Sequence, residues 1–369
     1  MLTFYNMRGT LDIVKDTIRR KYMLIVGDLH FSETSSLLSR GDTGDSNDPS
    51  SIRLKNMEDT IGWVVSIQKS HAVIQLGDFF DKKALTGNEL AILRKVIDTH
   101  NGKLKSWQVL VGNHGIDTAG DSIFALPTVI YDTPSFVISA NGKNVYVFLP
   151  YILQKNRKPL KEYLDKLRTV AWEGKRVIIF SHNDIVGQIP GGAGFSIKEI
   201  EENCTLFING HLHKREWVTS KILNVGNVTG QNFSEDATEG VPGIWQFDED
   251  SLELEFIANP YALLYAHWDF TGLNITSESV SKFTSRLPKE RLLVAVTVYA
   301  DQWNLVRPFV ETNTFKYKLI LKYRNIEGSG TTKVADDILD TEEKMSHIDK
   351  FIHEARKRYG DLTILEELK

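Results

Sequence analysis

Histidine, aspartate and asparagine side chains follow five short apolar runs of this chain. The segments are Gly27-Asp28-Leu29-His30, Gly77-Asp78, Gly112-Asn113-His114, Ser181-His182 and Gly210-His211-Leu212-His213. Neutral imidazoles suit borderline cations such as manganese or iron better than magnesium. Two cations about 3.5–4 Å apart can activate a water, hold the attacked phosphate and neutralise charge on the leaving oxygen. Taken together, the segments predict a two-metal phosphoesterase site.

The apolar runs before these segments have the composition of buried strands. They cover residues 22–26, 72–76, 107–111, 176–180 and 205–208, and are short and rich in β-branched residues. Residues 53–69, 88–100 and 159–173 carry apolar side chains at helical spacing and predict crossover helices. Strands alternating with helices predict a layered α/β domain, whose ligands lie at the carboxyl ends of the strands.

Each segment taken alone has a simpler interpretation. An Asp-x-His after a strand is more typical of a turn or a helix cap than of a metal site, and Gly-Asn-His is hardly more specific. The joint pattern differs, because independent turns have no reason to place His, Asp and Asn after five strands in this order.

The ordered set resembles the calcineurin-like metallophosphoesterase superfamily over residues 23–260. Within it the chain is most similar to the SbcD-type DNA repair nucleases and their phage relatives, which work with an SMC-like ATPase of the SbcC type. Gly77-Asp78-Phe79-Phe80-Asp81 is similar to the second motif of that branch, and a long tail follows the candidate catalytic domain.

The resemblance implies a role for each candidate residue. One metal ion would be held by Asp28, His30 and His213, the other by Asn113, His182 and His211, and Asp78 would bridge the two. His114 would orient or protonate the scissile phosphate or the leaving oxygen, a role that suits an imidazole titrating near neutral pH. The implied fold is a layered calcineurin-like sandwich with a small α+β capping domain and a C-terminal helical tail.

Two positions depart from the family pattern. The third motif usually continues with Asp after its His, whereas Gly115 follows here and the next carboxylate is Asp117. This leaves the partner of His114 open, although an imidazole's orientation depends on what its other nitrogen bonds. Cellular SbcD-type nucleases usually carry His where this chain has Asp81. An ionised carboxylate cannot donate a proton, so an exonuclease role tied to that position would be changed or lost.

Composition sets outer bounds on the class of protein. With 369 residues, 41% of them hydrophobic, the chain is long enough for two or three domains. Its single cysteine, Cys204, excludes internal disulfides and thiolate metal clusters. No segment approaches the ~18 apolar residues of a membrane span, and the extension at residues 1–22 lacks the apolar core of a secretory signal. We therefore expect a cytoplasmic protein, in the host cytoplasm if phage-encoded, that does not associate with membranes.

A formal charge of −4 argues against binding DNA by global attraction, so local basic clusters or a partner must supply the phosphate contacts. The clusters nearest the candidate ligands are Lys82 with Lys83 and Lys214 with Arg215. Weaker candidates are Arg53, Lys55, Lys155, Arg157 and Lys158, for which a solvated surface is the simpler interpretation.

The chain after the candidate catalytic domain divides into three segments. Residues 261–325 predict the small capping domain, 326–339 have the composition of a flexible linker, and 340–369 predict a helix. The helix carries an apolar stripe of Met345, Ile348, Ile352, Ala355 and Tyr359. This stripe either packs back on its own domain or docks to the coiled-coil base of an SbcC-like ATPase.

These inferences predict a two-metal-dependent DNA nuclease subunit for DNA end processing and recombination repair. Manganese is the expected ion, with magnesium or iron as alternatives, and a homodimer is expected by analogy with SbcD-type relatives. One alternative is a calcineurin-like phosphatase or cyclic-nucleotide phosphodiesterase on the same scaffold. Another is a non-catalytic subunit that holds DNA ends for the ATPase.

Overall fold

The computed structural model describes residues 22–33, 52–68, 71–82, 84–115, 126–188, 193–231, 237, 240–271, 291–311, 316–322 and 335–338. Several predictions lie outside these residues: the extension before Tyr22, the basic residue Lys83, the carboxylate Asp117 and the whole apolar stripe from Met345 to Tyr359. The chain divides into two compact units, and the change from one to the other near the predicted capping domain falls between Ala262 and Leu263.

The first unit contains two six-stranded mixed sheets. The first sheet has the order β12 (Leu254–Ala258), β11 (Gly243–Asp248), β1 (Tyr22–Val26), β2 (Ala72–Gln75), β3 (Trp107–Leu110) and β4 (Val129–Tyr131). The second has the order β5 (Ser135–Ile138), β6 (Asn144–Leu149), β7 (Arg176–Ser181), β8 (Leu206–Asn209), β10 (Ile222–Asn224) and β9 (Glu216–Thr219). The strands β1 to β4 run parallel, as do β6, β7, β8 and β10.

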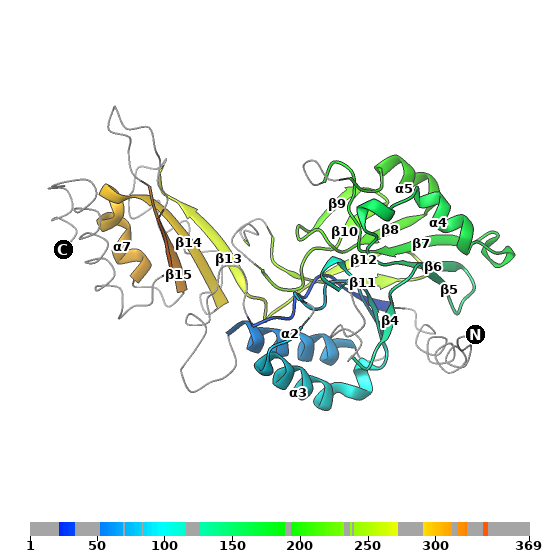
Figure 1. Cartoon of the computed structure of the whole chain (residues 1–369), viewed down its shortest axis with the longest axis horizontal. Coiled ribbons are helices and arrows are strands. Elements are labelled where there is room, and N and C mark those ends of the chain that lie inside the picture. Colours follow the sequence, from blue (N-terminus) through cyan, green and yellow to red (C-terminus); the bar gives the residue numbers. More distant parts are fainter. Residues whose placement is uncertain are drawn as a thin grey trace. The chain divides into compact units, whose positions relative to one another are not determined.

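The two sheets share one buried core between them. Met23 and Ile74 from the first sheet belong to the same cluster of buried side chains as Phe148, Phe180 and Ile208 from the second. Buried on both faces, these parallel strands carry the nearly continuous apolar runs seen in the sequence. The prediction of a layered α/β domain is confirmed at this level: the unit is an α/β sandwich with helices on the outer faces of its sheets (Figure 1).

The helices α2 (Ile52–Gln68) and α3 (Gly87–Leu104) cover the first sheet, and α4 (Leu160–Leu167) and α5 (Ile197–Asn203) cover the second. The start of α3 is fixed by a capping box, in which the Thr86 hydroxyl accepts from the amide of Glu89 and the Glu89 carboxylate accepts from the amide of Thr86. The helix predicted for residues 159–173 is shorter than expected. The backbone is extended at Arg168, after which Trp172 turns into the core.

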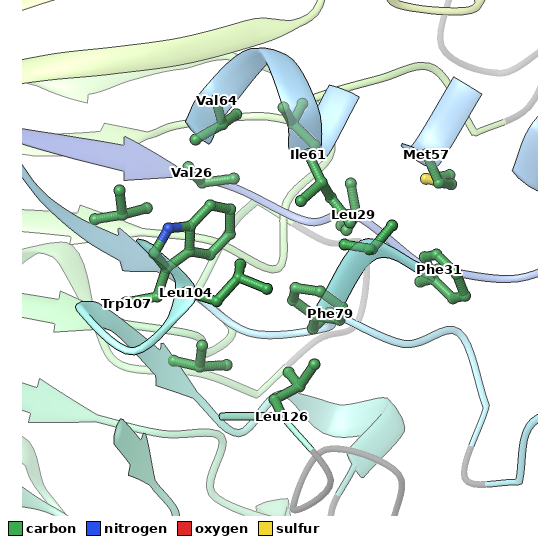
Figure 2. Close-up of a cluster of buried hydrophobic side chains, with 14 of the residues drawn as sticks. Val26, Leu29, Phe31, Met57, Ile61, Val64, Phe79, Leu104, Trp107 and Leu126 are labelled. Atoms are coloured by element: carbon green, nitrogen blue, oxygen red, sulfur yellow. The ribbon is translucent and has the colours of Figure 1, made fainter. Parts of the chain in front are cut away.

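The outer core of the first sheet is built from β1, α2, α3 and the segments after the strands, as Figure 2 shows. Trp107 and Leu104 pack beneath Val64, and Phe31 lies beside Met57. Burying each such side chain stabilises the fold by roughly 1.5–3 kcal/mol. Because Leu29, Phe31 and Phe79 belong to this cluster, the loops after β1 and β2 are anchored in the core rather than lying on the surface.

The second unit contains a four-stranded sheet of order β13 (Leu264–Asp269), β14 (Leu292–Tyr299), β15 (Lys316–Lys322) and β16 (Ala335–Ile338), with the helix α7 (Trp303–Glu311). Strands β13, β14 and β15 and the helix α7 fall within residues 261–325, the segment predicted as the capping domain. Most of the segment predicted as a linker, residues 326–339, lies outside the described residues, and its residues 335–338 form β16, which pairs with β15. No helix among the residues that the structure describes is long and apolar enough to cross a membrane.

Candidate metal centre

The candidate ligands lie at the carboxyl ends of strands from both sheets. Asp28 and His30 follow β1, Asp78 follows β2, and Asn113 begins the 3₁₀ turn after β3. The second sheet contributes His182 after β7 and the pair His211 and His213 after β8. Because the two sheets pack face to face over one core, these ends meet at the same edge of the sandwich. The sequence prediction that these side chains converge is therefore met by the structure.

One group of converging side chains consists of Asp28, His30 and His213, whose ligand atoms all lie within 4.8 Å of one another. The Nε2 atoms of His30 and His213 are 3.2 Å apart, and Oδ2 of Asp28 lies 3.8 Å from each. That carboxylate oxygen is buried and makes no hydrogen bond within the described residues. A buried carboxylate oxygen without a hydrogen bond is costly unless a cation compensates it, so these residues fit a divalent metal ion.

The second group consists of Asp78, His182 and His211, joined by Asn113. Nε2 of His182 lies 3.1 Å from Oδ2 of Asp78 and 2.9 Å from Oδ1 of Asn113. Nδ1 of His211 lies 3.0 Å from the same amide oxygen. Oδ2 of Asp78 is also 4.0 Å from Nε2 of His30 in the first group. The Asp78 carboxylate therefore stands between the two groups.

Carboxylates and imidazoles lie against one another in the site, and their pKa values reflect this. Burial alone would lower the pKa of His182, but the carboxylates of Asp78 and Asp28 raise it to about 9. Burial alone would raise the pKa of Asp78, but the neighbouring imidazoles, chiefly that of His182, hold it well below its usual range. Carboxylates that stay ionised in a buried pocket attract a cation.

Three candidate ligands have an unusual backbone conformation. His30, Asp78 and His211 adopt φ values of 49°, 46° and 66°, in the left-handed region that residues other than glycine rarely occupy. Strained residues of this kind cluster at functional sites, because the surrounding structure must hold them in place. Here the sharp turns aim the three side chains back toward one another. The strain is local, since Leu252 alone shares this conformation among the other described non-glycine residues.

Hydrogen bonds on the far side of the imidazoles fix their orientation. Nδ1 of His30 lies 3.0 Å from the carboxylate of Asp81, and Nδ1 of His182 lies 2.6 Å from the carbonyl of Leu76. Nε2 of His211 lies 2.8 Å from the carboxylate of Asp184. Metal-binding histidines characteristically donate their other N–H to such partners. Sequence reasoning missed Asp184. Its place two residues after His182 was visible, but no local pattern links it to His211.

A buried asparagine ladder supports the ends of β7, β8 and β10. Nδ2 of Asn209 donates to the carbonyl of Asn183 and lies 3.3 Å from Oδ1 of Asn224, and Oδ1 of Asn209 accepts from the amide of Asn183. All three side chains are fully buried. Because Asn183 follows His182 directly and Asn209 precedes the His211 turn, the ladder ties these two ligand loops together.

His114 lies at the rim of the site and its side chain is 38% exposed. Its Nδ1 lies 2.6 Å from the carbonyl of Asp81, and its amide donates to Oδ1 of Asp78. Its ring meets that of His30 edge-on, with centroids 4.9 Å apart. The partner that the sequence left open is thus a backbone carbonyl. Asp81 holds two imidazoles at once, His30 through its carboxylate and His114 through its carbonyl.

The basic residues suggested for DNA contacts occupy different environments. Arg53 and Arg157 are wrong as solvated surface residues, because Arg53 is buried and only 7% of the Arg157 side chain is exposed. Arg53 donates to the carbonyl of His30, and Arg157 pairs with Asp184. Nζ of Lys82 is 2.9 Å from the fully buried carboxylate of Glu89.

The two basic residues after the last ligand, Lys214 and Arg215, differ in their surroundings: one is exposed to solvent and the other packs on an aromatic ring. The guanidinium of Arg215 stacks on Phe256, 3.5 Å from the ring centroid. Lys214 is 71% exposed and lies 4.0 Å from Glu216. The sequence places Lys82, Lys83, Lys214 and Arg215 nearest the ligands. Among the three of these that the structure describes, Lys214 has the most exposed side chain.

Comparison with models of known protein families gave no match, and no curated protein is significantly similar to the chain. The interpretation of the site therefore rests on its own geometry. That geometry consists of buried His and Asp groups that could hold a metal ion, with the imidazoles oriented by outer hydrogen bonds.

Proposed function

We propose that this protein is a two-metal phosphodiesterase of the SbcD-type, calcineurin-like class, acting on DNA as the nuclease subunit of a complex with an SMC-like ATPase. One observation carries the proposal: Oδ2 of Asp78 lies 3.1 Å from Nε2 of His182 in one ligand group and 4.0 Å from Nε2 of His30 in the other. A single structural cation would not need a carboxylate placed between two separate ligand groups.

Seven residues would bind the two metal ions. Asp28, His30 and His213 would hold one ion, Asn113, His182 and His211 the other, and Asp78 both. When bound, two divalent cations, of which manganese suits these imidazole-rich groups best, lower the pKa of water and neutralise charge on the phosphate.

His114 is the residue suited to the leaving group. Because its Nδ1 is hydrogen-bonded to the carbonyl of Asp81, Nε2 remains for the substrate. As a hydroxide attacks phosphorus in line, the bond to the leaving sugar oxygen breaks, and that oxygen takes the Nε2 proton of the doubly protonated His114 ring, which is left neutral with its proton on Nδ1. The exposed position of this ring at the rim of the site suits contact with a phosphate group.

One observation favours a second candidate, a calcineurin-like phosphatase or cyclic-nucleotide phosphodiesterase. Cellular SbcD-type nucleases usually carry a histidine at the position of Asp81, and here the Asp81 carboxylate is held by His30 and offers no proton to a substrate. A small phosphate ester would need only the two ions and His114, without further contacts along a DNA strand.

The test compares the full-length protein on two substrates with added manganese: a DNA duplex and a chromogenic phosphomonoester. Hydrolysis of the duplex with little turnover of the monoester is expected. The reverse preference would replace the nuclease proposal with the phosphatase. Hydrolysis of neither substrate, together with no bound manganese, would refute both.

The variant His114→Asn separates catalysis from metal binding. It should abolish hydrolysis while manganese content stays near two ions per chain, because His114 holds no ion in this assignment. His100→Asn is the matched control, since His100 lies on α3 outside the site. Full activity of His114→Asn would remove the proposed proton donor.

The partnership is tested by co-purification. An SMC-like ATPase encoded beside this protein should be retained by the full-length chain and lost when residues 340–369 are removed. Retention by the shortened chain would place the ATPase contact elsewhere.

A further inference from the structure

The carboxylate of Asp184 connects a candidate metal ligand to a buried cation. Oδ1 of Asp184 lies 2.8 Å from Nε2 of His211, and Nη2 of Arg157 donates to Oδ2 at 2.7 Å. All three side chains are largely buried, with exposures of 15% for Asp184, 14% for His211 and 7% for Arg157. Hydrogen bonds between ionised groups are roughly twice as strong as neutral ones. The three residues therefore form a rigid chain that ends on the imidazole.

Arg157 is itself held by the loops on either side of it. Its Nη2 also donates to the carbonyl of Ile152 at 2.9 Å, and its Nη1 donates to the carbonyl of Ala193. The guanidinium carbon lies 5.7 Å from the ring centroids of both Tyr151 and Phe195. Arg157 thus connects the segment after β6 to the segment around Phe195. Because Arg157 also holds the Asp184 carboxylate, it fixes the hydrogen-bond partner of the His211 ring.

The hydrogen bonds also determine which nitrogen of His211 carries the proton. A carboxylate accepts but does not donate, so the proton of a neutral His211 lies on Nε2, facing Asp184. Nδ1 then presents a lone pair toward Oδ1 of Asn113, 3.0 Å away. Two lone pairs at this distance repel one another unless a cation lies between them.

The same reasoning applies to the neighbouring imidazole. Nδ1 of His182 faces the carbonyl of Leu76, which also only accepts, so the neutral ring presents the Nε2 lone pair to the amide oxygen of Asn113 at 2.9 Å. In the neutral form of the ring, which metal binding requires, this lone pair faces both Oδ2 of Asp78 and Oδ1 of Asn113. This arrangement is the one that a cation requires.

We infer that Asp184 and Arg157 are positioning residues for the metal ion at His211: the Asp184 carboxylate fixes the imidazole in the form that binds through Nδ1, and the Arg157 guanidinium fixes the carboxylate. The inference rests on the proposed function, because it assigns a role within the same metal centre. It also distinguishes the two ions. His30, whose Nδ1 faces Asp81, presents Nε2, whereas His211 presents Nδ1.

Manganese titration of the full-length protein tests this assignment. In Asp184→Ala we expect one of two manganese sites to weaken about 10–100-fold, the usual effect of losing such an outer partner. The other site should keep its wild-type affinity. Activity should return at saturating manganese, since the variant changes occupancy rather than chemistry. Arg157→Ala should weaken the same site, and Arg157→Lys should restore part of the loss.

Two controls separate positioning from general destabilisation. Glu162→Gln removes the exposed pair between Lys158 and Glu162, close to Arg157 in sequence but outside the site, and should leave both affinities unchanged. Nitrogen NMR of the His211 ring reports the tautomer directly: Nε2 is protonated in the wild type, and a mixture of forms is expected in Asp184→Ala. If the alanine variants fail to fold, Asp184→Asn and Arg157→Lys provide the same comparison with little change in volume.

The manganese titration has different outcomes if the proposed function fails and if only the positioning role fails. A wild-type protein that binds no manganese would refute the proposed function. A wild-type protein that binds two ions, with both affinities and the His211 tautomer unchanged in the Asp184 variants, would overturn the positioning role alone.

Discussion

Gly112→Ala tests whether the bridging carboxylate must lie exactly where the structure places it. Gly112 lies two residues after the end of β3 and packs directly on Asp78. A Cβ atom at this position would lie 2.7 Å from the carboxyl carbon of Asp78, against 3.4 Å for the shortest ordinary van der Waals contact. The carboxylate or the loop must therefore move by more than about 0.7 Å, the difference between these two distances, because Oδ1 and the backbone nitrogen of Asp78 lie nearer still to the added atom.

The displacement has two separable consequences. Overpacking of this kind destabilises proteins by about 1–3 kcal/mol, which should appear in urea unfolding without metal. A misplacement approaching 1 Å at a reacting centre costs about 10²-fold in rate, and affinity for both ions should fall because Asp78 is shared. Wild-type protein at a manganese concentration of 100 times Kd should gain about 2.7 kcal/mol of unfolding free energy for each independently bound ion. Gly112→Ala should gain much less.

Gly102→Ala is the matched control. Gly102 lies within α3 and nothing stands within 4 Å of a Cβ built there, so the added methyl meets no obstacle. Alanine favours helix over glycine by roughly 0.8–1.0 kcal/mol, and the control should gain stability while keeping its response to manganese. If Gly112→Ala unfolds at the wild-type urea concentration and is stabilised by manganese to the same extent, the close contact with Asp78 is not required and the argument fails.

Three further predictions concern charge. Asp78→Ala should bind neither ion at manganese concentrations that fill the wild-type sites, as measured by metal analysis after dialysis; retention of both ions would show that Asp78 is not shared. Burial raises the pKa of Glu249, whose carboxylate accepts from the Tyr146 hydroxyl, so its neutral form is favoured in the folded state. The stability it contributes is present below its usual pKa and is lost as pH rises through the raised value. Glu249→Gln should therefore gain stability relative to wild type as pH increases toward neutrality in urea unfolding, and a constant difference would contradict this. Lys82→Met should cost about 1–2 kcal/mol of unfolding free energy, because it removes a hydrogen-bonded charge from the buried Glu89; if only DNA affinity changes, Lys82 is a DNA contact instead.

Local patterns in the sequence were sufficient to place the candidate ligands at strand ends. A buried strand has a short apolar signature, and the polar residue that follows it must lie at the sheet's edge whatever the remainder of the chain does. Asp28, Asp78 and His182 were placed in this way, and the structure brings them together. Helix boundaries were less certain, as the early end of α4 at Leu167 illustrates.

The basic residues show the limit of such reasoning. Arg53 and Arg157 look like surface cations in the sequence, because arginine is seldom fully buried unless it is paired. Their partners are the carbonyl of His30 and the carboxylate of Asp184, each more than 20 positions away along the chain. No local pattern indicates such pairing, so burial of these guanidinium groups became visible only in the folded structure.

The sequence by itself determined which kinds of side chain reach the edge of the sandwich and in which order, because strand periodicity and the turns after strands are local properties of the chain. Only the tertiary structure decided how those side chains are oriented: which nitrogen of His211 faces Asn113, and that Asp81 holds both His30 and His114. Orientation depends on hydrogen bonds between loops that are far apart in the sequence. Those of Asp81 join three loops of the first sheet, and the contact of His211 with Asn113 joins the two sheets, so they exist only once the strands have paired and the sheets have packed over their common core.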